Sequence, residues 1–182
     1  MKELSLNILD IAENSAKAKA TLIEIGITEA EDTLTLTIAD NGCGMSAETV
    51  ESVTNPFFTT RTTRKVGLGI PLLKLAAEQT GGHLDIKSKM ASSSDDEHGT
   101  VVTALFYKNH LDCTPLGDGA ETIVTLIQGH PDIDFSFLHE KEGCSVSLDT
   151  RELRAVLEDV PLHTYEVIVW IRDNLSEQYN SF

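Results

Sequence analysis

Residues 3–18 constrain the fold most strongly, because they have two distinct faces when wound as a helix. Apolar side chains recur along one face at helical spacing. The other face is polar and carries Asn7, Asp10, Asn14 and Lys17, spaced three and four apart. A helix that packs on a sheet needs only its apolar face, so the polar stripe indicates that this helix also binds something.

Four alternating segments predict the strands of such a sheet. They are residues 21–27, 33–39, 83–90 and 100–107. Further helices are predicted at 46–53, where Ser46 is the expected N-cap, and at 67–82, with Pro71 in the first turn. This mixture of helices and strands predicts an α+β fold, a two-layer sandwich with helices on one face of a mixed, mostly antiparallel sheet.

From about residue 108 the pattern changes to a helix, a hairpin and two more helices. The chain is therefore expected to comprise a first domain, 1–107, and an αββαα extension, 108–182. The extension either adds a layer to the same core or forms a lobe that binds a partner, with Trp170 as its anchor. The sequence leaves both open.

Composition excludes several classes of function. The net charge of −15 at pH 7 repels polyphosphate backbones, so nucleic-acid binding is not expected. No apolar run is long enough to cross a membrane and the N-terminus lacks a signal-peptide pattern, which predicts a cytoplasmic protein without membrane contact. Cys43, Cys113 and Cys144 include no C-x-x-C pair, so we expect reduced thiols and neither a disulfide framework nor a zinc site.

The segment DNGCGM, residues 40–45, follows a predicted strand. An Asn-Gly pair in this place is typical of a hairpin turn, although the helical pattern that follows disfavours a hairpin. Gly42 and Gly44 allow the backbone to approach a flat ligand, and Asp40 can accept a hydrogen bond from an exocyclic amine. Adenine is flat and carries such an amine.

The segment VGLGI opens the helix predicted at 67–82. A plain glycine turn would have the same sequence, but free N–H groups at a helix N-terminus also make a phosphate site. The amide oxygen of Asn14 suits Mg²⁺ when phosphate oxygens and water supply the other ligands. The polar stripe would then have a purpose.

These motifs, in this order and spacing, resemble the GHKL superfamily of ATPases and kinases, named for gyrase, heat-shock chaperones, histidine kinases and MutL. DIAENSAKAKATLIEIGI resembles the Asn-box helix and following strand of the mismatch-repair ATPases. DNGCGM, VGLGI and HGTVV resemble the three glycine boxes. NPFFTTRTTRKVGLGIPLLKLAAEQTGGHLDIKS is more similar to sensor histidine kinases, including their ATP lid. The resemblance covers residues 3 to about 107.

The resemblance implies a site for ATP and Mg²⁺. It places Asn14 on Mg²⁺, Asp40 on the adenine amino group, and Thr100 beside Asp40 through water. The other nucleotide-binding residues that it implies are Lys17 at the phosphates, Gly42, Gly44 and Met45 around the base, Gly67, Leu68, Gly69 and Ile70 of the second glycine box, and the lid residues Thr59, Thr60, Arg61 and Lys65. For the basic lid residues, solubility of an exposed loop is the alternative.

Two positions depart from the family pattern. Asp10, the expected catalytic residue, stands where hydrolytic members have a Glu that activates water, and its shorter side chain predicts slow hydrolysis. Val66 replaces a glycine and is expected to stiffen the lid. Glu13 is acidic as well, but it points off the polar stripe and is expected at the surface or in a supporting role.

Sensor kinases carry their acceptor histidine on a helical hairpin before the Asn box, and no histidine of this chain lies in a resembling motif. Each is expected to be an ordinary surface or loop residue. The favoured hypothesis is an Mg·ATP-binding module that passes the γ-phosphoryl group to a separate signalling partner. The alternative is an ATP-operated switch, reset by slow hydrolysis, that controls a protein partner. A structural domain without nucleotide is least favoured, and a homodimer is left open.

Overall fold

The computed structural model describes residues 3–54, 68–91 and 98–182. In chain order the elements are α1 (Leu4–Lys17), β1 (Leu22–Glu29), β2 (Thr33–Asp40), α2 (Ala47–Val53), α3 (Gly69–Gln79), β3 (His83–Lys89), β4 (Gly99–Tyr107), α4 (Gly119–Gly129), β5 (Asp134–Lys141), β6 (Cys144–Asp149), α5 (Thr150–Leu157) and α6 (Tyr165–Asn180). Every helix and strand expected from the sequence is present. Within the described ranges, no helix is both long and apolar enough to cross a membrane.

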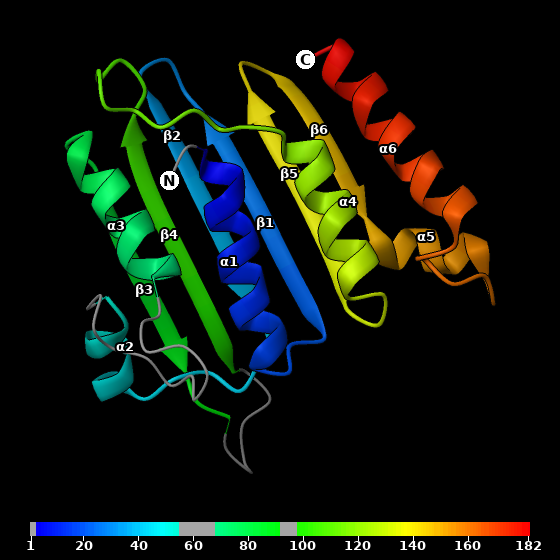
Figure 1. Ribbon diagram of the computed structural model, residues 1–182, viewed down its shortest axis with the longest axis horizontal. Coiled ribbons are helices and arrows are strands. Elements are labelled where there is room, and N and C mark those ends of the chain that lie inside the picture. The colour runs from blue at the N-terminus through cyan, green and yellow to red at the C-terminus, as the bar shows by residue number, and fades with distance from the viewer. Residues whose placement is uncertain (1–2, 55–67, 92–97) are drawn as a thin grey trace.

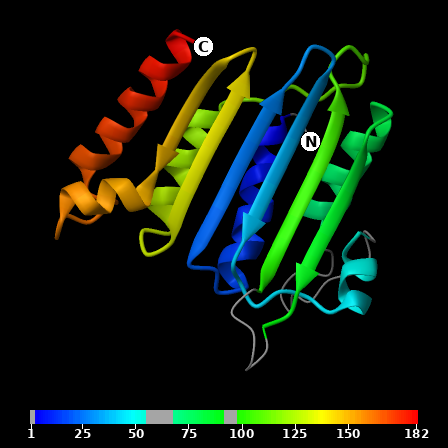
Figure 2. The same ribbon diagram turned by 180° about the vertical axis from the view of Figure 1, so that it is seen from behind.

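Six strands form one sheet in the order β3-β4-β2-β1-β5-β6. Neighbouring strands pair antiparallel except β1 and β5, which run parallel. Helices α1, α3, α4 and α6 lie over one face of this sheet (Figure 1), and the view from behind shows the strands of the other face uncovered (Figure 2). This arrangement confirms the predicted two-layer α+β sandwich with a mixed, mostly antiparallel sheet.

Side-chain alternation along the strands decides which face the helices cover. In β2, Leu34, Leu36 and Ile38 are buried, whereas the intervening threonines are half-exposed. Ile8 of α1 is buried in the same core. Asp40 ends β2 and continues the even-numbered series, so its side chain lies on the helix-covered face at one end of the sheet.

The extension continues the sheet of the N-terminal part. β5 lies parallel to β1 with Ile25 opposite Phe137, and both side chains belong to one apolar core that also includes α1. The connection from β4 to α4 passes the start of α1, where two of its carbonyls accept the first two N–H groups of that helix at 2.9 and 2.8 Å (Figure 1). These bonds satisfy donors that a helix N-terminus leaves unpaired.

Two details of the extension differ from the sequence-based prediction. His139, expected to be a surface or loop residue, lies in β5 and is only 2% exposed, so that expectation is wrong. The strand runs on to Lys141, because Glu142 and Gly143 alone make the turn to β6, with φ of 47° and 85°. Two positive φ values match the twist of paired strands. The polar run HEKEG was predicted to be turn, although its first three residues belong to β5.

Candidate functional site

The carboxylate of Asp40 is held from two sides at the end of β2. The hydroxyl of Ser15 in α1 donates to Oδ2 at 2.6 Å, and the N–H of Gly42 donates to Oδ1 at 2.9 Å. Ser15 is buried, whereas Asp40 is half-buried. A carboxylate has about four lone-pair positions, so these two bonds fix its orientation and leave acceptor capacity for a ligand.

Backbone segments approach one another closely around Asp40. A Cβ on Gly42 would lie 2.9 Å from a side chain just after α1, and a Cβ on Gly99 would lie 1.9 Å from the Asp40 carbonyl oxygen. Gly44 has a φ of +67°, and a Cβ there would lie 1.9 Å from the carbonyl oxygen of Lys89. Only glycine fits at these three positions. The first and third glycine boxes therefore meet at the end of β2.

A row of polar side chains crosses three neighbouring strands at this end of the sheet: Ser88 of β3, Thr100 of β4 and Asp40 of β2. The Oγ1 atom of Thr100 lies 2.8 Å from Ser88 Oγ, which also accepts the N–H of Met45 at 2.8 Å. The row ties the first glycine box to the edge of the sheet. The hydroxyl that bonds Asp40 directly is that of Ser15. Assistance from Thr100 to Asp40 through water stays a prediction.

The start of α3 lies against the polar stripe of α1. A Cβ on Gly69 would lie 3.1 Å from the Cβ of Asp10, which is itself exposed. Asn14 follows Asp10 one turn later on the same face and is half-buried. Leu68, at the N-cap of α3, is exposed and offers no side-chain cap to the first N–H groups, and Ile70 is half-buried behind it. Uncapped N–H groups at a helix start can bind a phosphate.

The metal that the resemblance implies would depend on few protein ligands. Among the described residues, no group of three His, Cys, Asp or Glu side chains is placed to hold a metal ion. The oxygens of Asn14 and Asp10 on the polar stripe of α1 are suitable donors for hard Mg²⁺, which keeps several waters and takes phosphate oxygens. The residues present therefore fit an ion that arrives with a nucleotide, and they do not fit a metal caged by protein alone.

Lys17 and Glu13 lie on the side of α1 that faces α4. The Nζ of Lys17, predicted at the phosphates, is 3.6 Å from Glu13 Oε2 and its side chain is 57% exposed. The other carboxylate oxygen of Glu13 lies 2.7 Å from Nε2 of His130, which ends α4. The hydrogen bond from His130 lowers the pKa of Glu13, although burial acts the other way. Glu13 therefore joins α1 to the extension.

The structure brings the predicted site residues into two groups. Asp40, Gly42, Gly44, Met45 and Thr100 gather around the end of β2. Asp10 meets the start of α3 at Gly69, between Leu68 and Ile70, and Asn14 follows Asp10 one turn later on α1. The lid predictions Thr59, Thr60, Arg61, Lys65 and Gly67, together with the departure at Val66, lie outside the described residues. They stay predictions.

Sequence reasoning missed three side chains of the site. Ser15 shares the helical spacing of the apolar face, although a hydroxyl directly after Asn14 and turned toward the sheet could have indicated a partner at a strand end. Ser88 shares the helix-covered side of β3 with Leu84 and Ile86, a position where a hydroxyl stands out. His98 is the first residue of HGTVV, where the resemblance gives it no role, and its Nδ1 lies 2.6 Å from the carbonyl oxygen of Gly42.

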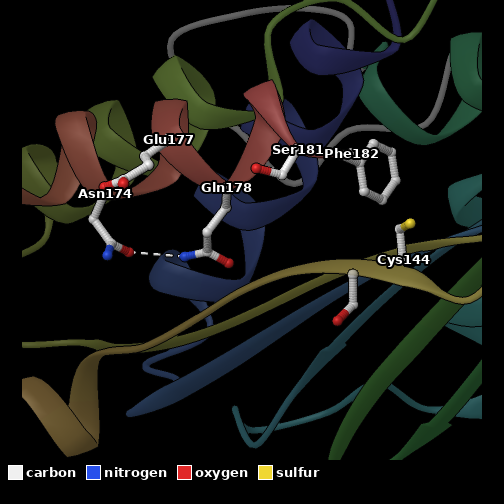
Figure 3. Close-up of a pocket in the computed structure, with 7 residues that line it drawn as sticks. Cys144, Asn174, Glu177, Gln178, Ser181 and Phe182 are labelled. Carbon is white, nitrogen blue, oxygen red and sulfur yellow. Dashed lines mark hydrogen bonds between the residues drawn. The ribbon is translucent and has the colours of Figure 1, made fainter.

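A hollow of about 460 Å³ lies elsewhere, between α6 and β6 (Figure 3). It is lined by Cys144, Ser145, Asn174, Glu177, Gln178, Ser181 and Phe182, none of which is a predicted site residue. The amide of Gln178 accepts the N–H of Ser147 at 2.8 Å and donates to its carbonyl at 3.1 Å. Gln178 thus satisfies backbone groups of an edge strand, and the hollow belongs to the seating of α6 on the sheet.

A one-sided helix layer, a strand-end aspartate and glycine-lined turns together define an ATP-binding domain of the GHKL class. Residues 1–110 match the family described as histidine kinase-, DNA gyrase B-, and HSP90-like ATPases, and the chain belongs to this family. The predicted resemblance is confirmed, and membership of the family supports a nucleotide as the ligand.

Relatives and a solved structure extend this result. The sensor histidine kinase CpxA of Escherichia coli K12 is 32% identical over 78 residues, 40% of this chain and 17% of that protein. A sensor protein of Shewanella frigidimarina is 30% identical over 107 residues, 58% of this chain and 15% of that one. The chain thus spans less than a fifth of the length of these curated relatives. The Aquifex aeolicus MutL ATPase domain complexed with ADP has the same fold, with a TM-score of 0.55 at 16% identity over 87% of this chain and 70% of that one.

Proposed function

We propose that the chain binds Mg·ATP at the end of β2, with the adenine amino group on Asp40 and the phosphates at the start of α3. The observation that carries this proposal is the pair of bonds from Ser15 and Gly42 to the Asp40 carboxylate. They orient an acceptor with remaining lone pairs inside a backbone cradle that excludes side chains. Such a carboxylate suits an exocyclic amine on a flat base.

Asn14 would hold Mg²⁺ through its amide oxygen, and the ion would supply positive charge at the phosphates of a strongly acidic protein. Asn14→Ala is expected to remove most of the Mg²⁺ dependence of ATP binding, measured by calorimetry with and without the metal. Asn7→Ala, two turns earlier on the same stripe, is the matched control and is expected to keep that dependence. An Asn14→Ala protein with unchanged dependence would place the metal elsewhere.

The bound nucleotide would serve phosphoryl transfer to an acceptor on a separate signalling partner. In that step the acceptor forms a bond to the γ-phosphorus, the bond to the bridging oxygen breaks, and ADP leaves. Positioning and charge neutralisation carry such a reaction, and the protein needs little covalent chemistry of its own. The relatives named as sensor proteins and sensor histidine kinases support this reading.

A second function, an ATP-operated switch, is favoured by two observations. The Asp10 carboxylate lies at the start of α3, where a base could activate water. The fold is also shared with a MutL ATPase domain over 87% of this chain, which reaches well into the extension. Hydrolysis through the short Asp10 side chain would be slow and would reset a partner-binding state.

The test follows bound nucleotide and free phosphate with γ-labelled Mg·ATP, for wild type, Asp10→Asn and Glu13→Gln. Tight binding without phosphate release, unchanged in both variants, supports the kinase reading and directs the search to an acceptor. Phosphate release that Asp10→Asn loses and Glu13→Gln keeps supports the switch. A wild-type protein that binds no ATP overturns both.

A further inference from the structure

We infer that His98 is a positioning residue of the adenine subsite, because it fixes the first glycine turn, residues 42–44, from the start of β4. The inference rests on the proposed function, since it concerns how the same site recognises a base. His98 opens the segment HGTVV, which resembles the third glycine box, but the resemblance assigns this histidine no role.

The ring of His98 completes the bonding of Gly42. Its Nδ1 lies 2.6 Å from the Gly42 carbonyl oxygen, and the ring is half-buried. A carbonyl only accepts, so Nδ1 must carry the proton. The N–H of the same glycine donates to Asp40 at 2.9 Å. One backbone residue is therefore bonded to the histidine on one side and to the base-recognising carboxylate on the other.

The backbone that carries the ring is itself fixed. Gly99, the next residue, presses against Asp40 so closely that a Cβ there would lie 1.9 Å from the Asp40 carbonyl oxygen. Thr100 is then paired opposite Asp40 in the β2–β4 ladder. Backbone bonds hold the middle of this turn: the Cys43 N–H donates to the Ala18 carbonyl and the Cys43 carbonyl accepts from the Ala91 N–H, each at 2.9 Å. His98 and Asp40 add side-chain bonds to the carbonyl and the N–H of Gly42.

Loss of the hydrogen bond between His98 and Gly42 should weaken recognition of the base. A loosened Gly42 holds the Asp40 carboxylate less firmly, and that carboxylate accepts from the amine of adenine while it repels the carbonyl that guanine has in the same place. The affinities for ATP and ADP should fall equally, because the terminal phosphate lies at the other group of site residues. The preference for ATP over GTP should fall as well.

The experiment compares His98→Ala, His98→Asn and His98→Gln by calorimetric titration of the full chain with ATP, ADP and GTP. An asparagine amide nitrogen stands near the place of Nδ1, whereas a glutamine amide nitrogen stands near the place of Nε2. We expect Ala and Gln to raise the Kd of ATP and ADP about fivefold, as the loss of one hydrogen bond predicts, and Asn to retain most of the affinity. His163→Ala, at an exposed position, should change nothing.

Wild-type affinity and base preference in His98→Ala would overturn the inference, and so would equal losses in the Asn and Gln variants. The hydrogen bond is also measurable without nucleotide, from the ¹⁵N shifts of the ring at a pH well above the usual histidine pKa. A protonated Nδ1 with an unprotonated Nε2 supports the inference, and the opposite tautomer overturns it. Absence of nucleotide binding by the wild type would overturn the proposed function, and the ring measurement still decides the histidine bond.

Discussion

The N-terminal part and the extension use polar side chains in different ways. In the N-terminal part, the side chain of Asp40 bonds a hydroxyl and a backbone N–H and keeps acceptor capacity. In the extension, polar groups pair with partners of opposite charge. Examples are Arg154 with Asp134 at 2.7 Å and Arg172 with Glu121 at 2.9 Å. The N-terminal arrangement is suited to receiving a ligand, whereas these charged groups of the extension are already paired.

The contrast extends to the buried histidine of the extension. Nε2 of His139 lies 3.1 Å from Glu29 Oε1, and Nδ1 lies 3.0 Å from the hydroxyl of Tyr179. The ring also packs on Phe182, with ring centroids 4.5 Å apart. This cluster seats α6 on the sheet at the end remote from Asp40. A buried histidine with both nitrogens bonded stabilises the fold and offers no open position to a ligand.

The largest effect is expected where the two regions share their core. Phe137→Ala should lower the free energy of unfolding by about 3–5 kcal/mol, because the ring is buried between β5 and the helices. Hydrogen exchange should show β3 and β4 losing protection together with α6, since one core spans both regions. Leu138→Ala, on the uncovered face, should cost far less. Protection retained in β3 and β4 while α6 opens would make the regions independent domains.

The next effect separates ligand binding from stability. Asp40→Ala should raise the Kd for ATP roughly a hundredfold, because the adenine amine loses a charged acceptor. Asp149→Ala in the extension removes the N-cap of α5, where Oδ1 accepts the Arg151 N–H at 2.9 Å. It should cost about 1 kcal/mol of stability and leave ATP affinity intact. Calorimetry with denaturant unfolding measures both, and an Asp40→Ala protein that still binds ATP tightly would remove the adenine assignment.

A smaller effect concerns paired and unpaired polar groups on α1. Asn7 is 1% exposed, and neither amide atom has a hydrogen-bond partner in the described part of the chain. Asn7→Ala should therefore raise the free energy of unfolding by about 1 kcal/mol, since burying an unpaired amide is costly and alanine favours helix. Ser15→Ala, which breaks the bond to Asp40, should lower it by a similar amount. Equal losses in both variants would indicate that Asn7 is bonded in solution.

Gln178 of α6 protects the edge strand of the extension, β6. Gln178→Ala should cost about 1 kcal/mol and expose the N–H and carbonyl of Ser147 to pairing with another chain. Light scattering should then show self-association that increases with concentration. Glu177 lines the same hollow but does not bond Ser147, so Glu177→Ala is the matched control and should keep the stability and the association state of the wild type. A monomeric Gln178→Ala protein of unchanged stability would contradict this role.

The smallest effect is a pH dependence from His139. Burial lowers the pKa of His139 below its ordinary value of 6.5, although the hydrogen bond to Glu29 acts in the opposite direction. As the pH falls through 6.5, the unfolded chain binds a proton before the folded protein does. The free energy of unfolding should therefore decrease as the pH is lowered through this range, as measured by urea unfolding. His139→Phe should flatten that decrease and His163→Gln should not. A wild-type free energy of unfolding that increases as the pH is lowered through this range would contradict the prediction.

Sequence patterns predicted the site in part, for a physical reason. Asp40, Gly42 and Gly69 lie in short motifs of characteristic residue types, so their places can be read from neighbouring letters. Ser15 and His98 act through bonds to residues 25 and 56 positions away. No local pattern records such a pairing, and a serine on an apolar helix face is read as core.

Helix and strand periodicity, the strand-end aspartate and the glycine boxes were determined by the sequence itself, because each is visible in a run of a few residues. Only the tertiary structure decided that β5 inserts parallel beside β1, that His139 is buried, and that Asp10 lies against the start of α3. Strand order and burial follow from which distant apolar faces close on one another, with Ile25 meeting Phe137 across the β1–β5 ladder. That choice is made by the whole core, and no single segment contains it.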